Sequence, residues 1–237
     1  MTFFGADEAG RGPVLGPMVA AAAVADPEVL PAGVADSKTL TAAKREALAT
    51  TMAANERIAT GIAIVSPARI DDPAADMNSL TVTAQAEAIT RALDLDIDSD
   101  ADGTPVDDPA GESNEAVPEG VVDACDTDPE RFARRVREAI PVTVDLSGGH
   151  RAEESHAIVA AASVLAKVER DSLVADLDAQ HGEYGPVGSG YPSDPRTRNF
   201  LREYVGEHGH LPACARASWQ TSRDVLDAAE QSTLGEF

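Results

Sequence analysis

Residues 3–13 read Phe-Phe-Gly-Ala-Asp-Glu-Ala-Gly-Arg-Gly-Pro, and a second apolar run follows at residues 19–24. The first apolar residues predict a short strand that delivers two adjacent carboxylates, Asp7 and Glu8. Consecutive strand residues point to opposite faces, so these carboxylates share a site only if the strand ends beside them. The glycines of the Gly-Arg-Gly turn indicate such an ending, because glycine accepts backbone angles and close approaches that other residues do not. The stretch therefore suggests a carboxylate metal site beside a backbone cradle for a phosphate or a sugar.

The size and composition of the chain fit one large domain, or a domain with a small appendage. Of its 237 residues, 43% are apolar, which is enough for a core. No run reaches the roughly 20 apolar residues that a membrane helix needs, and the N-terminus lacks a signal-peptide pattern. Cys125 and Cys214 form no C-x-x-C pair and indicate no disulfide framework. We expect a soluble, monomeric, cytoplasmic protein with two inert cysteines and no membrane partner.

The charge is strongly acidic, with 41 Asp and Glu against 19 Lys and Arg and a net charge of −22. Only three lysines occur, at positions 38, 44 and 167. An acidic composition poor in lysine is typical of proteins from high-salt cytoplasms. Net charge alone argues against a nucleic-acid partner, since phosphates attract basic patches. Screening weakens this argument, because the Debye length is only about 3 Å at 1 M salt, so net charge does not decide the partner.

The hydrophobic pattern predicts a mixed α/β fold, a sheet with helices on its faces. Strands are expected at residues 3–6, 19–24, 57–65, 120–125 and 141–144, the last ending at Asp145 before a Gly148-Gly149 turn. Helices are expected at residues 42–52, 77–93, 129–139, 153–178, 196–204 and 222–229. Thr41 and Asp128 are candidate N-caps of two of these helices.

The segment 94–119 holds ten acidic residues and no Lys or Arg. Low hydrophobicity with high net charge is typical of disorder, so we expect a solvated insertion loop. Its Asp-x-Asp-x-Asp spacing resembles a calcium loop, but such a loop wants Gly at its sixth position and Glu at its twelfth. Neither register of the segment supplies them, so calcium binding is disfavoured.

The candidate chemistry rests on carboxylates carried to the ends of apolar runs. Asp7 and Asp123 each follow such a run, Asp36 lies in a turn, and Glu153 and Glu154 are expected to open a long helix. A carboxylate in apolar surroundings must be paired, hydrogen-bonded or metal-bound. Clustered oxygen ligands suit Mg²⁺ or Mn²⁺. No zinc spacing, P-loop or Gly-x-Ser-x-Gly elbow is present. The pattern favours phosphodiester hydrolysis, in which two metal ions can activate water and stabilise the leaving oxygen.

At this point the motifs closely resemble one family, ribonuclease HII, the type 2 ribonuclease H, in its archaeal style. The matching runs follow in family order at residues 7–17, 36–40, 77–80, 122–124 with 131–132, 160–171, 188–197 and 216–219. They cover nearly the whole chain and leave segment 94–119 as an insertion. The resemblance implies a ribonuclease H-like core at residues 1–180 and a helical C-terminal part at residues 181–237 that contributes to substrate binding.

The resemblance also implies the reaction, which is metal-assisted endonucleolytic hydrolysis leaving 5′-phosphate and 3′-OH ends. The implied substrates are the RNA strand of RNA–DNA hybrids and duplex DNA containing single ribonucleotides, cleaved on their 5′ side. Four acidic residues hold Mn²⁺ or Mg²⁺ in this family, and Asp7, Glu8 and Asp123 take three of the places. The fourth is usually an aspartate, where this chain has Glu153. Glutamate keeps the charge and adds one methylene, so it is the preferred catalytic and metal-binding candidate over Glu154 and Asp145.

The same resemblance implies substrate-binding residues. Gly10, Arg11 and Gly12, together with Tyr191, match residues that recognise the ribose 2′-OH, the group that distinguishes RNA from DNA. Positions near phosphate are matched by Lys38, Ser163 and Lys167. Arg170 and Asp171 are expected to form a structural pair on a helix surface, and Trp219 is expected to be a core residue.

Three alternatives stay open. Ribonuclease HIII, a sister enzyme, is disfavoured because it carries Lys where Arg11 stands and has an N-terminal substrate-binding domain. A hybrid-binding protein whose catalysis is impaired by the change at Glu153 is the alternative of another class. Residues 231–237 resemble a sliding-clamp-binding tail only weakly, because such tails usually end in paired aromatics, and a frayed terminus is favoured.

Overall fold

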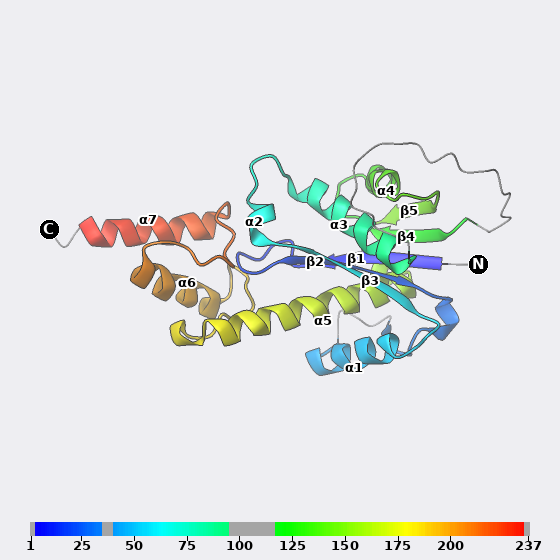
Figure 1. The fold of residues 1–237 in the computed structure, drawn as a ribbon, viewed down its shortest axis with the longest axis horizontal. Coiled ribbons are helices and arrows are strands. Elements are labelled where there is room, and N and C mark those ends of the chain that lie inside the picture. The colour runs from blue at the N-terminus through cyan, green and yellow to red at the C-terminus, as the bar shows by residue number, and fades with distance from the viewer. Residues whose placement is uncertain (1–2, 35–39, 95–116, 235–237) are drawn as a thin grey trace.

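The computed structural model describes residues 3–34, 40–94 and 117–234, and its centre is a five-stranded sheet (Figure 1). The strand order is β3-β2-β1-β4-β5. The first three strands are antiparallel neighbours, and β4 and β5 run parallel to β1. The strands are β1 (Phe3–Ala9), β2 (Met18–Val24), β3 (Ala59–Val65), β4 (Glu119–Asp123) and β5 (Asp145–Gly149). The expected mixed sheet is confirmed.

Helices cover both faces of this sheet, and two further helices extend beyond its end (Figure 1). Cluster contacts place α3 and α4 on one face and α1 and α5 on the other. The helices are α1 (Ala42–Ala53), α2 (Pro67–Ile70), α3 (Met77–Ala92), α4 (Pro129–Glu138), α5 (Ala157–Gln180), α6 (Pro195–His208) and α7 (Gln220–Leu234). The described residues also form the short 3₁₀ turns η1 (Pro27–Val29), η3 (Ala152–Glu154) and η4 (Gly182–Tyr184). The expected caps Thr41 and Asp128 accept hydrogen bonds from the first turns of α1 and α4.

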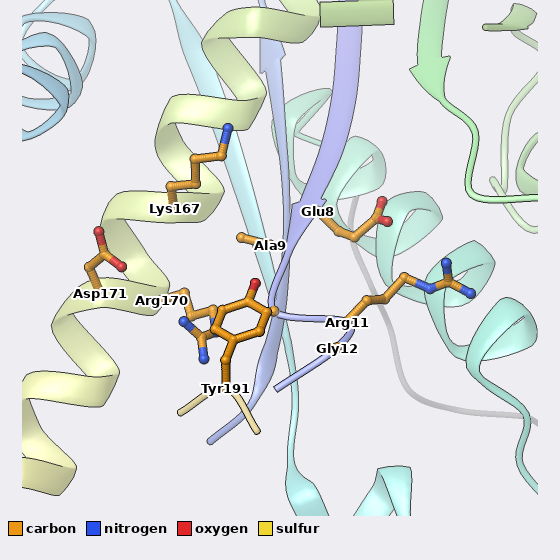
Figure 2. A pocket seen from close by; sticks show the side chains of 9 residues that line it. Glu8, Ala9, Arg11, Gly12, Lys167, Arg170, Asp171 and Tyr191 are labelled. Atoms are coloured by element: carbon orange, nitrogen blue, oxygen red, sulfur yellow. The ribbon is translucent and has the colours of Figure 1, made fainter. Parts of the chain in front are cut away.

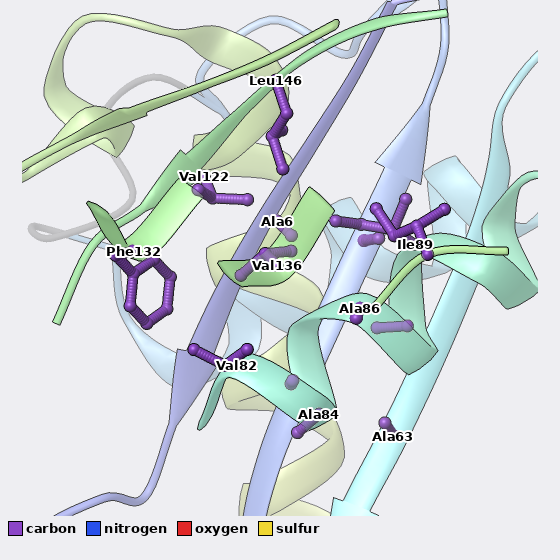
Figure 3. Close-up of a cluster of buried hydrophobic side chains, with 14 of the residues drawn as sticks. Ala6, Ala63, Val82, Ala84, Ala86, Ile89, Val122, Phe132, Val136 and Leu146 are labelled. Carbon is purple, nitrogen blue, oxygen red and sulfur yellow. The ribbon is translucent and has the colours of Figure 1, made fainter. Parts of the chain in front are cut away.

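Strand alternation divides the core into two layers of small side chains. On β2, Ala20 and Ala22 pack toward α3 and α4, whereas Ala21 and Ala23 pack toward α5. Figure 3 shows the first of these layers, with Ala6 of β1, Val82 of α3 and Val136 of α4 among its residues. The small residues let α5 approach the sheet closely: a Cβ on Gly5 of β1 would lie 2.8 Å from the backbone nitrogen of Val159. The alternation of β1 therefore decides which helix each carboxylate at its end will face.

The C-terminal part has an apolar cluster of its own, and the N-terminal chain enters it. Val14 and Leu15, which follow the Gly-Arg-Gly turn, pack with Phe200 and Leu201 of α6. Leu15 also forms an isolated antiparallel bridge with Ala215. The turn is therefore held between the sheet and the C-terminal part.

Several predicted boundaries are wrong around the site. Residues 141–144 form no strand; β5 begins at Asp145 and includes Gly148 and Gly149, which were expected to be a turn. Tertiary pairing overrides propensity here, because β5 pairs with β4 and a Cβ on Gly148 would meet the Pro129 carbonyl oxygen of α4. Glu119, assigned to the insertion, already belongs to β4. In the described ranges, no helix is both long enough and apolar enough to cross a membrane.

Candidate active site

The site lies where the parallel strands β1 and β4 reach the same edge of the sheet. Ala6 pairs with Val122, so Asp7 and Asp123 follow at the same level of neighbouring strands. β1 ends at Ala9, directly after its two carboxylates, as the glycines predict; its pairing with β4 stops at Ala6, whereas its pairing with β2 continues through Glu8 and Ala9. Pairing with an antiparallel neighbour keeps the strand extended through both acidic residues. Asp7 and Glu8 consequently point to opposite faces.

Different helices hold the two carboxylates. Asp7 is buried and accepts a hydrogen bond from Ser163 of α5. Glu8 faces α3, where its Oε2 accepts a hydrogen bond of 2.6 Å from Nε2 of Gln85. The same amide nitrogen donates to the main-chain oxygen of Asp123 at 3.0 Å. Gln85, which is fully buried, therefore links the ends of β1 and β4.

The pKa values of both carboxyl groups are raised, because the nearby positive charges do not offset burial. Burial is the main cause that raises the pKa of Asp7 to about 7, and the charge of Asp123 raises it further. Burial likewise raises the pKa of Glu8 to about 8, with the charge of Asp7 as the second cause. Arg11 acts in the opposite direction on Glu8, but does not offset the burial.

A lysine on α5 completes the surroundings of Asp7. Nζ of Lys167 donates to Oγ of Ser163 at 2.8 Å, and the two residues lie one helical turn apart. The positive charge of Lys167 lowers the pKa of Asp7, although less than burial raises it. Ser163 thus connects an ammonium group to the buried carboxylate.

Asp123 and Glu153 are brought near each other by a main-chain contact. The N–H of Ala152 donates to Oδ1 of Asp123 at 2.7 Å, which anchors the turn η3 against the end of β4. Glu153, the next residue, is buried with 8% of its surface exposed. The expectation that Glu153 and Glu154 open the long helix is wrong, since both lie in η3 and α5 begins at Ala157.

The two alternatives to Glu153 fit less well. Glu154 is exposed. Asp145 starts β5 at the end remote from the site, because Gly149 is the residue that pairs with Asp123. Gly149 lies four residue steps along β5 from Asp145, about 13 Å at roughly 3.3 Å per residue. The sheet register thus contradicts Asp145 as a ligand beside Asp123.

These carboxylates have the right donor atoms for a divalent metal ion but are not clustered as a preformed metal site. In the part of the chain that the structure describes, no group of three or more His, Cys, Asp or Glu side chains is arranged to hold one metal ion. The donor set nevertheless fits a hard divalent cation, because carboxylate oxygens are the ligands such ions prefer. The raised pKa values of Asp7 and Glu8 are what a bound cation would reverse.

The Gly-Arg-Gly turn and Tyr191 line a cavity of about 340 Å³ next to Glu8 (Figure 2). Its lining is completed by Ala9, Lys167, Arg170 and Asp171. Gly10 has a φ of +87°, and a Cβ there would collide with the side chain of Arg170. Tyr191 is 42% exposed, and the Arg170 guanidinium lies 5.5 Å from its ring centroid. The cavity therefore joins the turn, an aromatic ring and one of the carboxylates.

The expected pairing of Arg170 with Asp171 is wrong. Arg170 is buried and donates to the main-chain oxygen of Ser189 at 3.3 Å. Asp171 instead pairs with Arg45 of α1 at 2.8 Å. Adjacent helix residues face different neighbours, so Arg170 is part of the cavity wall.

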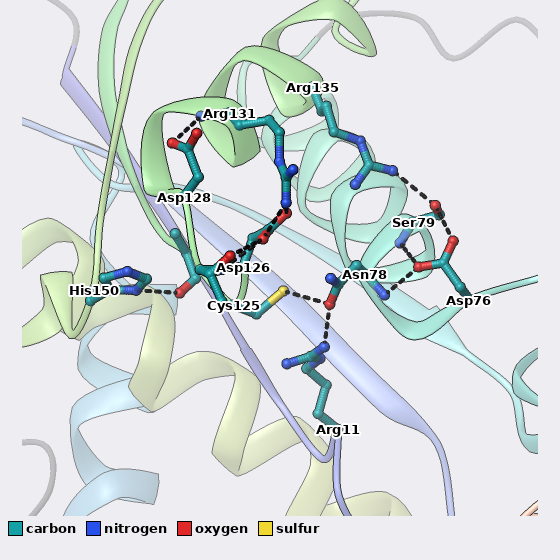
Figure 4. Close-up of polar contacts among 12 residues, drawn as sticks. Arg11, Asp76, Asn78, Ser79, Cys125, Asp126, Asp128, Arg131, Arg135 and His150 are labelled. Carbon is teal, nitrogen blue, oxygen red and sulfur yellow. Dashed lines mark hydrogen bonds and ion pairs between the residues drawn. The ribbon is translucent and has the colours of Figure 1, made fainter.

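The side chain of Arg11 extends from the turn to the start of α3, where it is bonded to Asn78 (Figure 4). Its Nη2 donates to Oδ1 of Asn78 at 2.6 Å, and the Cys125 thiol donates to the same oxygen at 3.8 Å. Burial raises the pKa of Cys125 to about 11, and burial also raises that of Cys214 to about 11. Both thiols are therefore protonated at neutral pH, as inert cysteines would be.

Of the candidate residues, Asp36 and Lys38 lie outside the described ranges. Sequence reasoning missed three residues that hold the site: Gln85, Asn78 and Arg216. Gln85 is the one amide among the buried positions of α3, which are otherwise aliphatic residues and threonines, a signal that could have identified it. Asn78 lies in a matched motif but was given no role.

Comparison with known proteins decides the family. The family model described as Ribonuclease HII matches residues 4–222. The chain belongs to the ribonuclease HII family. Ribonuclease HII of Haloarcula marismortui is 50% identical over 234 residues, covering 99% of each chain. Ribonuclease HII of Halobacterium salinarum is 49% identical over 237 residues, covering both chains fully.

Solved structures agree with this family. The ribonuclease H2 of Pyrococcus horikoshii superposes with a TM-score of 0.79 at 32% identity, covering 98% of this chain and 100% of the other. The ribonuclease HII in a PCNA complex from Archaeoglobus fulgidus superposes with a TM-score of 0.74 at 33% identity, covering 93% of this chain and 96% of the other. A ribonuclease HIII in complex with Mn²⁺ superposes with a TM-score of 0.69 at 19% identity, which shows that it shares the fold.

The family confirms the expected enzyme class. The chain is a ribonuclease H, a hydrolase with endonuclease activity on the RNA of RNA–DNA hybrids. Enzymes of this fold depend on divalent metal ions. The expected ribonuclease H-like mixed sheet is confirmed as well.

Proposed function

We propose that this enzyme cleaves the RNA strand of hybrids and also cuts on the 5′ side of single ribonucleotides embedded in duplex DNA. One observation carries the proposal: the cavity formed by the Gly-Arg-Gly turn and Tyr191 opens directly beside Glu8 and Lys167. The turn and Tyr191, which would contact the sugar, thus lie adjacent to Glu8 and Lys167, which can act on the neighbouring phosphate. The proposed products carry 5′-phosphate and 3′-OH ends.

Asp7, Glu8, Asp123 and Glu153 are the proposed metal ligands. When bound, Mg²⁺ or Mn²⁺ supplies activation of water and neutralisation of charge on the phosphate. The chain's own residues prepare the site for this. Gln85 fixes Glu8 relative to β4, Ser163 fixes Asp7, and the N–H of Ala152 fixes Asp123. Asp7, Glu8 and Asp123 are therefore each held by a different neighbour before any substrate binds.

Lys167 and the turn are the proposed contacts to the nucleic acid. Lys167 lines the cavity, where its ammonium group can meet a phosphate oxygen. The second proposed phosphate contact on α5, Ser163, is buried and already bonded to Lys167. We therefore assign it to holding Lys167 and Asp7 in place, and Lys38 keeps its predicted role near phosphate.

Recognition of the 2′-OH is assigned to Gly10, Arg11 and Gly12 with Tyr191. A Cβ on Gly12 would lie 3.7 Å from Cε1 of Tyr191, so ring and turn face the same small space. A 2′-OH both donates and accepts hydrogen bonds, which a peptide backbone and a phenol can match. A deoxyribose leaves these polar groups unmatched.

A sliding clamp is a second proposed partner. The Archaeoglobus fulgidus relative is in a complex with PCNA. In this chain, α7 remains helical through Leu234, and the last three residues lie outside the described ranges. Co-elution of the enzyme with the clamp, lost when residues 231–237 are removed, would support the contact.

The function is tested by cleavage of duplex DNA containing one ribonucleotide and of an RNA–DNA hybrid, with Mn²⁺ or Mg²⁺, at low and molar salt. We expect cleavage of both, on the 5′ side of the single ribonucleotide. Binding without cleavage in every condition would indicate an impaired hybrid-binding protein. Cleavage of the hybrid alone would indicate ribonuclease HIII-like specificity.

A further inference from the structure

Arg216 is a fully buried arginine in a chain whose net charge is −22. It lies in the segment between α6 and α7, about two hundred residues from the Gly-Arg-Gly turn in sequence. Every acceptor of its hydrogen bonds is a main-chain carbonyl of that N-terminal region. The C-terminal part therefore reaches the turn through one side chain.

The contacts hold the turn from one side only. Nη2 of Arg216 donates to the oxygen of Gly10 at 2.6 Å, and Nη1 donates to that of Arg11 at 2.9 Å. Nε and Nη2 both donate to the oxygen of Gly16, at 3.0 and 2.9 Å. Nε1 of Trp219 donates to the oxygen of Gly12 at 3.2 Å. Three consecutive carbonyls of the turn are thus bound by two side chains.

The segment that carries Arg216 and Trp219 is itself held in place by further contacts. The Trp219 ring lies 5.0 Å from the Arg216 guanidinium carbon. Both carboxylate oxygens of Asp71, which follows α2, accept N–H groups of the next residues, Ala217 at 2.7 Å and Ser218 at 2.9 Å. The segment is therefore bonded both to the N-terminal turn, through Arg216, and to Asp71 after α2, through Ala217 and Ser218.

Fixing the carbonyls also fixes the N–H groups. In a planar trans peptide the C=O and N–H point in opposite directions. The carbonyls of Gly10 and Arg11 point to Arg216, so the N–H groups of Arg11 and Gly12 point away from it. Within the described ranges neither N–H forms a hydrogen bond. Arg11 and Gly12 both line the cavity with Tyr191.

Stability alone does not explain a charge in this place. Burial lowers the pKa of Arg216 to about 10, and the neighbouring charge of Arg170 lowers it further, so the group stays charged at neutral pH. A buried charge is costly even when hydrogen-bonded, and apolar residues of similar volume often fill such space at no loss of stability. A fork of N–H donors, however, can fix several carbonyls at once.

We propose that Arg216, braced by Trp219, is a positioning residue that sets the sugar-reading face of the Gly-Arg-Gly turn, so that discrimination for a 2′-OH depends on it. This inference rests on the proposed function of that turn.

The test compares Arg216→Met, Arg216→Lys and an exposed control on α7, Arg223→Met. Each enzyme cleaves duplex DNA with one ribonucleotide and the same duplex with a 2′-fluoro nucleotide at that position. We expect Arg216→Met to lower the ratio of the two kcat/KM values on the order of tenfold or more, because the donors facing the 2′-OH lose their fixed direction. Arg216→Lys should lie between, and Arg223→Met should match the parent enzyme.

A structural role would produce a different result. If Arg216 only stabilised the fold, its removal would lower the melting temperature and weaken binding of an all-DNA duplex, while the kcat/KM ratio would stay unchanged; that outcome would overturn the inference. Should Arg216→Met not fold, Trp219→Phe keeps an aromatic ring beside Arg216 and removes the N–H that donates to Gly12. An unchanged ratio in a folded Trp219→Phe enzyme would then overturn the proposal. A parent enzyme that cleaves no ribonucleotide substrate would refute the proposed function itself.

Discussion

At the scale of single residues, the four carboxylates differ in how firmly the structure fixes them. Asp7 is buried between strand and helix, and Asp123 is bonded to the main chain of η3. Glu153 is the residue that the sequence resemblance predicts at the place where the family usually has aspartate. Glu153 lies in the 3₁₀ turn η3 and not in α5, so the helix does not fix the backbone position from which its longer side chain extends toward the site.

We expect Asp7→Asn to lower kcat by at least about 10³-fold, because bound metal supplies several kcal/mol of charge stabilisation and each 1.36 kcal/mol is tenfold in rate. Glu153→Asp should retain or increase activity, whereas Glu153→Gln, which keeps the shape, should lose it. Steady-state cleavage with circular dichroism as the folding control measures this. Full activity in Glu153→Ala would move the fourth ligand to Glu154.

The pH dependence of metal binding follows from the raised pKa values of Asp7 and Glu8, about 7 and about 8. The folded protein holds protons there that the unfolded chain, with ordinary carboxyl pKa values, releases above about pH 5. Without metal, the free energy of unfolding should therefore fall as pH rises from about 5 to 8. Stabilisation by Mn²⁺ should grow over the same range, because the cation replaces those protons.

Melting temperatures in chelator and in Mn²⁺, measured from pH 5 to pH 9 at constant ionic strength, test this expectation. This range spans the raised pKa values of Asp7 and Glu8. The matched control is Asp7→Asn, which cannot release a proton there and should show a flatter dependence. A gain from Mn²⁺ that is equal at every pH would show that these carboxylates are ionised throughout.

The residues that sequence reasoning could find are those carried by local motifs. Asp7, Glu8 and the Gly-Arg-Gly turn stand together in the chain, and Tyr191 lies in a matched loop. Arg170 was misassigned, and Gln85 and Arg216 were missed, because their roles depend on which strand or turn lies opposite them. Such partners lie up to 206 positions away in sequence, beyond the reach of any local pattern.

At the scale of elements, β5 shows what local propensity could not supply. Its sequence, Asp-Leu-Ser-Gly-Gly, has little strand preference, and it forms because β4 offers a parallel partner and α4 leaves room only for glycine. The helices with clear periodicity, α3 and α4, were predicted nearly to their ends. The site depends on β5, since Gly149 accepts the N–H of Ala124 and leads into η3.

The acidic segment gives the prediction that belongs to this scale. Replacing residues 95–116 with an uncharged Gly-Ser linker of equal length removes eight acidic residues and changes the net charge from −22 to −14. We expect the variant to fold and to retain cleavage, because a segment of such low hydrophobicity adds little to a core. The edit must stop before Glu119, which pairs in β4. Loss of folding would show that the segment packs.

At the scale of the whole molecule, the excess of negative charge acts against the compact state. Self-repulsion in a chain of net charge −22 falls as salt shortens the Debye length from about 10 Å at 0.1 M to about 3 Å at 1 M. We therefore expect the melting temperature to rise between these concentrations, and to rise less in the linker variant of net charge −14 than in the parent. KCl and NaCl at equal ionic strength should act alike if screening is the cause. An equal rise in parent and variant would assign the effect to burial of apolar surface, which salting-out ions also strengthen.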